Sequence, residues 1–470
     1  MNVMSLISDW KPRRLVWIPL AAAAALAAAG CSSGLSSVAS TSGVTGSAFV
    51  IGTDAPLASV TSFVVQVKSV DAVDASGNSV SLLSGSPTVD FARYNGLQTL
   101  LDMNDVPVGT YTSVNITLGS SATIGYLATG SGAPTIQTEA ATLTTTNVTV
   151  NLANPLVIAK ASAPAGLRVD FDLRKSIAVD TSGNITGTVN PTFNIKTVGE
   201  GDSDAHIDEF TAGIVSVDAA AQSFVMQGPH GEQFTVKVDG QTAWDNNESI
   251  SDLTTNSIVQ VSGELDKADQ TFDADEVAII SQHGFYATGQ VTYVTPASGA
   301  ATSFDLYVRS LMPTNTGITL GQIATVNLTG SEKFLVFRMH NTLTQFAFNS
   351  STMIPGQTVA IGGSASGAAN AGAVSVTRVS LRDWGFNGTV VAGSVNSSQG
   401  TFQMKVNGFA GVLIPETVTV WVDSSSEYRD GLGDLAEIGA NTNVRVVGLL
   451  LRDPTSGNVV LLAHYVDQLD

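Results

Sequence analysis

The stretch SFVVQVKSV, residues 62–70, has apolar side chains at positions 63, 65 and 67 and polar side chains at 66 and 68. Successive side chains of a strand point to opposite faces, so this alternation predicts a strand with one buried face. The same period of two occurs in TSVNITLG at 112–119, ATLTTTNVTVNL at 141–152 and GLRVDFDL at 166–173. Turns rich in Asp, Ser, Gly and Asn separate these stretches. We therefore expect an all-β fold, with an N-terminal β-sandwich over residues 48–198.

After residue 205, one order of short segments occurs three times. Each copy begins with an aromatic residue and a glycine-containing strand: FTAGIV at 210–215, FYATGQV at 285–291 and WGFNGTV at 384–390. Each copy later has a valine-rich strand that ends on glycine, at Gly263, Gly363 and Gly448. A unit of this size removes its sheet edges by closing into a small barrel, with glycines where a strand bulges or bends. We expect three tandem OB-like β-barrels at residues 210–284, 285–382 and 383–470, the second with insertions.

Cys31 is the only cysteine in the 470 residues, so it cannot form a disulfide within the chain. Upstream, Lys11 and two arginines precede an alanine-rich apolar stretch at 15–29. A basic segment, an apolar segment and small residues, in that order, are typical of a secretory signal. The stretch is too short to be a convincing transmembrane helix. We expect a signal peptide over residues 1–30.

The residues Ala28, Ala29 and Gly30 before Cys31 resemble the lipobox of bacterial lipoproteins, in which the cysteine is diacylated and becomes the new N-terminus. The lipobox usually has Leu three positions before the cysteine, where this chain has Ala28. The resemblance implies lipidation at Cys31 and a membrane partner through that lipid anchor. Two alternatives stay open: a free thiol in an ordinary secreted protein, and twin-arginine export through the pair at 13–14.

Residues 31–47 are rich in Ser, Gly and Thr and carry no charge, which is typical of a flexible tether. Ser32 stands where an Asp would indicate retention in the inner membrane. The expected location is therefore the cell envelope, anchored to the outer membrane on its periplasmic or its surface face. The net charge of −19 argues against nucleic acid as a partner, because binding phosphates requires Lys and Arg.

Two larger resemblances follow from longer motifs. AFVIGTDAP at 48–56 and LQTLLDMNDVPVGTYTSVNITL at 97–118 resemble domain-of-unknown-function family 4382. The three later repeats resemble domain-of-unknown-function family 5666, a small β-barrel module often found in tandem behind such domains. Neither resemblance implies an established activity or catalytic residues, so no catalytic residue is assigned.

An acidic segment, GEGDSDAHIDEF at 199–210, follows the predicted sandwich. Its carboxylates can gather on one side of an extended loop, and hard oxygen ligands suit calcium. The candidate metal ligands are Asp202, Asp204 and Asp208, with Glu200, His206 and Glu209 beside them. The segment lacks the spacing of an EF-hand loop, and an acidic, solvated linker over residues 199–209 explains the same composition. Calcium is the only cofactor that the sequence suggests.

Other polar candidates have structural explanations. Asp54, in TDAP, is expected to accept hydrogen bonds from its own turn. Asp170 and Asp172 lie on one face of a predicted strand and resemble a pair of glycosidase acids only superficially. The five histidines show no spacing typical of zinc ligands or of a catalytic triad; they are His206, His230, His283, His340 and His464.

Large aromatic residues are the remaining candidates for ligand contacts, because such rings can stack on sugars. They are Trp244, Tyr286, Tyr307, Trp384, Trp421 and Tyr428. Aromatic residues at strand starts more often fill the end of a barrel, so we expect most of them in the core. The sequence favours a non-enzymatic binding or structural module whose partner is an envelope protein or a polysaccharide. The alternative is a hydrolase or metal-dependent enzyme acting on an envelope or extracellular substrate.

Overall fold

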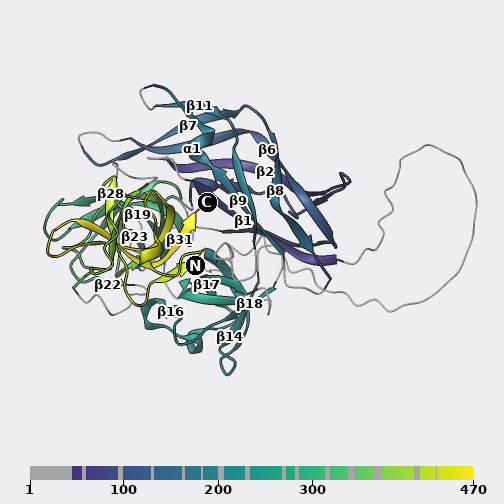
Figure 1. Ribbon diagram of the computed structural model, residues 1–470. Coiled ribbons are helices and arrows are strands. Elements are labelled where there is room, and N and C mark those ends of the chain that lie inside the picture. Colours follow the sequence, from purple (N-terminus) through teal and green to yellow (C-terminus); the bar gives the residue numbers. More distant parts are fainter. Residues whose placement is uncertain are drawn as a thin grey trace, which may run out of the picture. The chain divides into compact units, whose positions relative to one another are not determined.

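The computed structural model describes residues 45–55, 60–93, 99–128, 132–160, 165–181, 184–198, 206–227, 233–266, 271–280, 285–312, 318–336, 345–363, 373–406, 413–429 and 431–469. Cys31, Asp202 and Asp204 lie outside these residues. Among the described residues, strands predominate, as Figure 1 shows. The predicted all-β class is confirmed.

The N-terminal domain consists of two sheets. The first has the order β12–β9–β1–β5 and comprises β1 (Thr45–Ala55), β5 (Thr99–Pro107), β9 (Ala165–Asp172) and β12 (Phe193–Val198). The second has the order β10–β11–β7–β6–β2–β3, with β4 paired to β2 and β8 paired to β6. Its strands are β2 (Val60–Asp74), β3 (Ser79–Ser81), β4 (Thr88–Asp90), β6 (Gly109–Ala128), β7 (Thr135–Leu143), β8 (Asn147–Ile158), β10 (Ile177–Val179) and β11 (Ile185–Val189). β1 begins at Thr45, so the last three residues of the predicted tether belong to a strand.

Both sheets contribute side chains to one hydrophobic core. On β2, Phe63, Val65 and Val67 are buried, while Gln66 and Lys68 are exposed, as the alternation predicts. Phe63 meets Phe171 of the other sheet, with ring centroids 4.8 Å apart. The sequence period therefore identifies the face of β2 that packs against the opposite sheet.

The first barrel follows as a six-stranded sheet of order β15–β14–β13–β17–β18–β16, closed by an additional pairing of β15 with β18. Its strands are β13 (His206–Asp218), β14 (Ser223–Gln227), β15 (Gln233–Lys237), β16 (Ala243–Trp244), β17 (Ile258–Asp266) and β18 (Thr271–Ile279). Five strands close the ring, and this pairing is that of an OB-like barrel. β13 begins at His206, so residues 206–209 of the predicted linker are strand.

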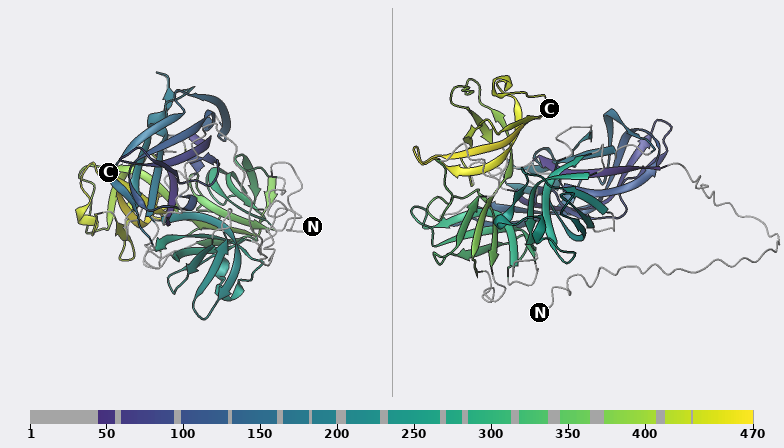
Figure 2. Two further views of the ribbon diagram at one scale, coloured as in Figure 1. Left: turned by 90° about the vertical axis from the view of Figure 1, so that its right-hand side faces the viewer. Right: turned by 90° about the horizontal axis from the view of Figure 1, so that it is seen from below.

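The last barrel repeats this arrangement, with the order β28–β27–β26–β30–β31–β29 and closure of β28 onto β31. Its strands are β26 (Trp384–Val390), β27 (Thr401–Val406), β28 (Thr417–Trp421), β29 (Glu427–Arg429), β30 (Asn443–Arg452) and β31 (Val459–Leu469). In Figure 2 the last barrel is the light-green to yellow part of the chain. Each strand pairing of the first barrel has a counterpart in the last.

Between the barrels lies a seven-stranded sheet, here called the middle sheet, of order β22–β25–β23–β19–β20–β21–β24. It comprises β19 (Phe285–Thr295), β20 (Ser303–Met312), β21 (Ile323–Asn327), β22 (Lys333–Val336), β23 (Thr358–Gly363), β24 (Ala373–Ser375) and β25 (Arg378–Arg382). β24 pairs with β21, and β25 pairs with β23. Because β24 and β25 are two pieces of one extended stretch, the strand order matches that of the barrels.

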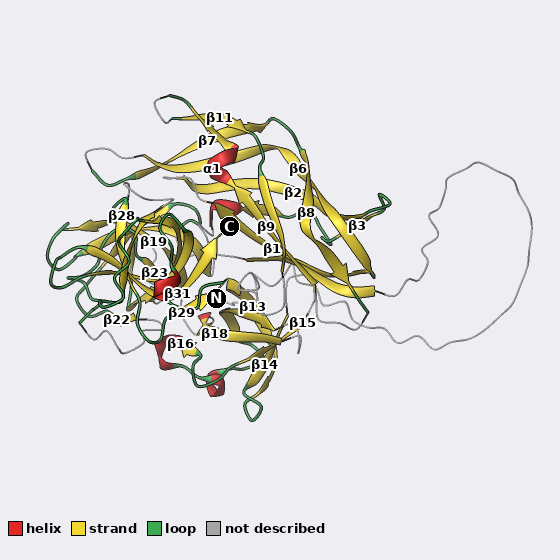
Figure 3. Cartoon of the chain, viewed as in Figure 1, coloured by secondary structure: helices red, strands yellow, loops and turns green. Residues whose placement is uncertain are grey.

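Helix is scarce, as Figure 3 shows. α1 (Leu173–Ser176) has a single turn, capped by the Asp172 carboxylate, which accepts a hydrogen bond from the Lys175 backbone N–H at 3.0 Å. Short 3₁₀ turns occur at η2 (Phe91–Arg93), η4 (Asp245–Asn247), η5 (Ile250–Asp252) and η8 (Leu435–Glu437). Within the described residues, we find no helix whose length and apolar character would allow it to span a membrane.

Candidate functional site

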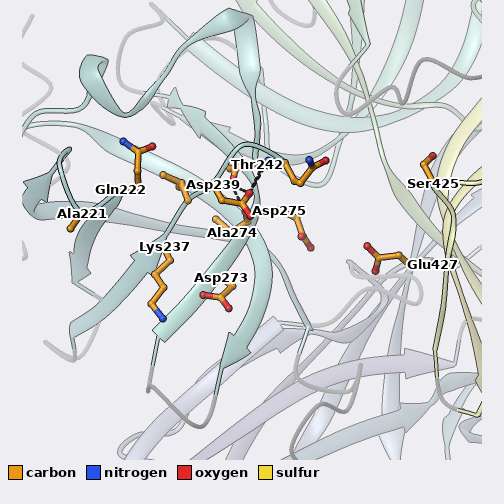
Figure 4. Close-up of a pocket in the computed structure, with 12 residues that line it drawn as sticks. Ala221, Gln222, Lys237, Asp239, Thr242, Asp273, Ala274, Asp275, Ser425 and Glu427 are labelled. Atoms are coloured by element: carbon orange, nitrogen blue, oxygen red, sulfur yellow. Dashed lines mark hydrogen bonds between the residues drawn. The ribbon is translucent and has the colours of Figure 1, made fainter.

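A cavity of about 540 Å³ lies beside the turns of the first barrel (Figure 4). Most of its lining comes from the first barrel: Ala221, Gln222, Lys237, Val238, Asp239, Gln241, Thr242, Asp273, Ala274 and Asp275. The last barrel contributes Ser425 and Glu427. The lining therefore offers hydroxyl, amide, amine and carboxylate groups from two of the domains.

The turn after β15 forms one wall of this cavity. The Asp239 carboxylate accepts hydrogen bonds from the backbone N–H groups of Gln241 at 2.8 Å and of Thr242 at 3.1 Å. The Thr242 hydroxyl donates to the carbonyl of Ala274, on β18, at 2.8 Å. This is an Asx turn tied to the neighbouring strand, so the Asp239 carboxylate is held in place by its own turn.

The last barrel has the same turn after β28. The Asp423 carboxylate accepts a hydrogen bond from the Ser425 N–H at 2.8 Å, and the Ser426 hydroxyl donates to the Ala463 carbonyl, on β31, at 2.8 Å. Ser425 of this turn faces the cavity. Equivalent turns of two barrels thus supply opposite parts of one lining.

Carboxylates dominate the remaining lining. Asp273 and Asp275 lie on β18, and Asp275 and Glu427 lie on facing sides of the cavity in Figure 4. Lys237 adds a single amine beside Asp273. Carboxylate, hydroxyl and amide oxygens all accept hydrogen bonds, so the cavity suits a ligand that carries many hydroxyl or amine donors.

An ion-paired contact joins the first and last barrels next to this cavity. Arg429 lies 2.7 Å from Glu264 of the first barrel and 2.7 Å from Glu427 of its own strand. Its guanidinium also stacks over the Tyr465 ring, 4.2 Å from the ring centroid. Burial disfavours the charged form of Arg429, but Glu264, Tyr465 and Glu427 outweigh it, so the pKa of Arg429 lies above its usual value. The exposed Glu427 is thus paired with Arg429 at the cavity wall.

The structure describes only part of the acidic segment. His206 is buried on β13, 3.7 Å from Asp275 and 5.5 Å from the Tyr465 ring centroid. The backbone of Asp208 belongs to β13, but its side chain, like Asp202 and Asp204, lies outside the described residues. The described residues contain no group of three or more His, Cys, Asp or Glu side chains that could hold a metal ion. The calcium site remains a prediction.

The other polar candidates do not come together at the cavity. Asp170 is half-buried on β9, and Asp172 caps α1 and pairs with Lys175 at 2.7 Å. His464 is buried and hydrogen-bonded to Asp383. His230, His283, His340 and the side chain of Asp54 lie outside the described residues.

The aromatic candidates lie mostly in the interior, as expected. Tyr286, Tyr307 and Trp384 are buried. The half-buried Trp244, Trp421 and Tyr428 pack against the hydrophobic cores. None of the six residues lines the cavity described above, so stacking of a ligand on these rings has no support there.

Sequence reasoning missed the cavity residues, although a signal for them is present. The Asx turns have the sequences DGQT at 239–242 and DSSS at 423–426, each directly after a valine-rich strand. An Asp followed three residues later by Thr or Ser, after the third strand of two barrels with one strand order, marks a turn with an ordered carboxylate. Only the fold shows that the two turns line one cavity.

The described chain is thus an all-β protein with two closed five-stranded barrels. Residues 45–189 match the family "Domain of unknown function (DUF4382)", and residues 212–278 match "Domain of unknown function (DUF5666)". The resemblance to the first family is therefore confirmed in the N-terminal domain. The resemblance to the second is confirmed for the first barrel, and for the two later repeats it stays a prediction. No curated protein matches the chain.

Among solved structures, a Drosophila chain described as "Unr CSD456" matches at 9% sequence identity. The match covers 56% of this chain and 97% of that chain, with a TM-score of 0.14. A TM-score of this size supports no conclusion about the present fold or its function.

Proposed function

We propose that the protein is an envelope lipoprotein, lipidated at Cys31, whose barrels bind a hydroxyl-rich ligand such as an envelope polysaccharide without catalysis. The middle sheet and the last barrel would be further copies of the module matched at 212–278. Their common strand order supports this origin. OB-like barrels commonly bind oligosaccharides or oligonucleotides through one face and its loops, and the charge of −19 argues against the latter.

The cavity is the observation that carries the proposal. It combines hydrogen-bond acceptors from two barrels, and Asp239 and Glu427 are held there by their own hydrogen bonds and ion pairs. The backbone N–H groups of the turn both donate to Asp239 Oδ1, so Oδ2 can accept a hydroxyl of a ligand. In the proposed binding role the carboxylates act as hydrogen-bond acceptors, without proton transfer.

Binding is tested with a panel of purified bacterial surface polysaccharides and the full chain. We expect at least one polysaccharide to bind, and Asp273→Asn to weaken it about tenfold, the effect of losing one charged hydrogen bond. Glu416→Gln changes an exposed acid outside the lining and serves as the matched control. Binding that is equal in both variants would count against the cavity, and release of soluble sugar would favour the hydrolase alternative.

The anchor has a separate test. Cys31→Ala should move the protein from the membrane fraction to the soluble envelope fraction, because two acyl chains provide stable membrane binding and none would remain. Mass spectrometry of the native protein should find diacylglycerol on Cys31. Continued membrane retention of the variant would contradict lipidation as the anchor.

A further inference from the structure

Charged side chains are buried where the first barrel meets the middle sheet. Asp245 in η4 and Glu276 on β18 come from the first barrel, and Arg378 and Arg382 on β25 come from the middle sheet. With Glu248, which follows η4, they form what we call the junction cluster. The exposed fractions of the four fully buried residues are between 1% and 5%.

Two ion pairs cross this junction. Arg378 Nη2 lies 3.1 Å from Asp245 Oδ2, and the Ser380 hydroxyl donates to the same carboxylate at 3.3 Å. Arg382 Nη2 lies 3.3 Å from Glu276 Oε2. Arg382 Nη1 also donates to the Tyr286 hydroxyl at 2.7 Å. Two guanidinium groups are thus matched by two carboxylates.

Glu248 is the third carboxylate of the cluster. It is half-buried and accepts a hydrogen bond from the Ile279 N–H, on β18, at 3.1 Å. Burial is the main cause that raises the pKa of Glu248 to about 7; the charges of Asp245 and Asp252 add to it, while the Ile279 hydrogen bond and Arg378 oppose it. Glu248 therefore changes charge near neutral pH.

The proton on Glu248 decides the charge balance of the junction. With Glu248 protonated, the cluster has two positive and two negative charges; without the proton it has a surplus negative charge in a poorly solvated place. An unbalanced buried charge is costly. The apolar core at this junction is small, consisting of Ala278, Ile280, Tyr286 and Ala360 with two partly buried neighbours. Little apolar burial is present to compensate.

We propose that the joint between the first barrel and the middle sheet is held by the protonated form of Glu248 and loosens when Glu248 loses its proton. The groups that face Glu248 are Asp245, Asp252 and the Ile279 N–H from the first barrel, and Arg378 from the middle sheet.

Amide hydrogen exchange of the full chain tests the joint. The deprotonated fraction of Glu248 rises about tenfold between one pH unit below and one unit above its pKa. After correction for intrinsic rates, exchange in peptides covering 271–280 and 378–382 should rise about tenfold between about pH 6 and about pH 8. Peptides covering β27 and β28, in the last barrel, provide an internal reference.

Glu248→Gln keeps the shape of the side chain and removes its charge, so its junction peptides should exchange equally at both pH values. Glu416→Gln, a change to an exposed acid of the last barrel, should behave as the natural protein does. A natural protein with no rise in exchange at the junction would overturn the proposal, whether or not the variant folds. An equal rise in Glu248→Gln would overturn it as well.

Thermal unfolding gives a second readout. The folded-state pKa of about 7 lies above the ordinary value of 4.5, so protonation stabilises the folded state. That stabilisation is complete below about pH 4.5 and is lost as pH rises through about 7. The Tm of Glu248→Gln should therefore exceed that of the natural protein by an amount that grows over this window and is constant above it. A Tm difference that does not change with pH would contradict the assignment.

Discussion

In the first and last barrels the fifth strand of the ring, β18 or β31, is continuous. In the middle sheet the corresponding strand is divided into β24 and β25. β18 pairs with both β17 and β15, and β31 pairs with both β30 and β28. In the middle sheet these two pairings are divided between β24 and β25. The same strand order therefore gives a closed ring twice and an interrupted one once.

The closeness of the neighbouring strand to a glycine of the fourth strand differs between the barrels and the middle sheet. Gly263 and Gly448 both follow a register shift. A Cβ atom on Gly263 would lie 2.1 Å from the Asp273 carbonyl oxygen, and a Cβ atom on Gly448 would lie 2.0 Å from the Leu462 carbonyl oxygen. Because these glycines have no side chain, β18 and β31 can approach the fourth strand closely at the bulge and bend toward the third strand, β15 or β28. A Cβ on Gly363 would be 3.1 Å from the Ser375 oxygen. The backbone at Ser375 thus lies further from Gly363 than the corresponding backbones lie from Gly263 and Gly448. This larger separation is found where β24 ends, before β25 begins.

The two kinds of sheet also use buried arginine differently. In the last barrel, Arg445 on β30 lies 2.7 Å from Asp467 on β31, and Asp467 is fully buried. In the middle sheet, Arg378 and Arg382 reach the first barrel instead. Buried charges are thus paired within the last barrel, and across the contact between the first barrel and the middle sheet.

The largest effect is expected from breaking the internal pair. Arg445→Met leaves the Asp467 charge buried and unpaired, and should lower the free energy of unfolding by about 3–5 kcal/mol. Urea denaturation measures this loss. Arg174→Met, at an exposed residue of α1, should change stability by less than about 0.5 kcal/mol. The double variant Arg445→Met, Asp467→Leu should recover most of the loss, and failure to recover would show that packing dominates at this site.

The bulge glycines come next. Gly448→Ala places a methyl group against the Leu462 carbonyl and should cost about 3 kcal/mol of unfolding free energy; Gly363→Ala, with more room, should cost about 1 kcal/mol. Gly213→Ala is the control, because no atom lies within 4 Å of the added Cβ. If denaturation found Gly448→Ala as stable as Gly213→Ala, the bulge would not explain barrel closure.

Much of this comparison could be predicted from local sequence. The period of two identified the buried face of β2, and the bulges at Gly263 and Gly448 confirm the expectation that the glycines mark barrel corners. The leading glycine of the first barrel differs, since no atom approaches within 4 Å of a Cβ built on Gly213. The alternation of buried and exposed faces depends on side chains two residues apart in one strand, which a single sequence displays.

The cavity and the charged contacts could not be predicted in this way. Arg378 meets Asp245, and Arg429 meets Glu264, only because separate units pack together. Periodicity within a strand carries no information about which strand of another domain lies opposite. The cavity likewise requires Asp275 and Glu427 from different barrels. Such pairs depend on how separate units pack together, which the sequence pattern within one unit does not predict.

The smallest expected effect concerns the turns after the third strand. In both barrels a hydroxyl of this turn donates a hydrogen bond to the fifth strand. The Thr242 hydroxyl donates to the Ala274 carbonyl, and the Ser426 hydroxyl donates to the Ala463 carbonyl. In the middle sheet the Glu332 carboxylate instead accepts hydrogen bonds from its own turn, at the N–H groups of Thr329 and Gly330. Ala274 and Ala463 pair with Gly263 and Gly448, so the hydroxyls hold the fifth strand where it bends.

Thr242→Val and Ser426→Ala should therefore each lower the free energy of unfolding by about 1 kcal/mol, the usual value of one hydrogen bond. Ser331→Ala, in the exposed turn of the middle sheet, should have an effect below about 0.5 kcal/mol. Urea denaturation of the three variants side by side measures the differences. Equal losses at all three positions would mean that the hydroxyl stabilises only its own turn, and closure would then depend on the glycine bulge alone.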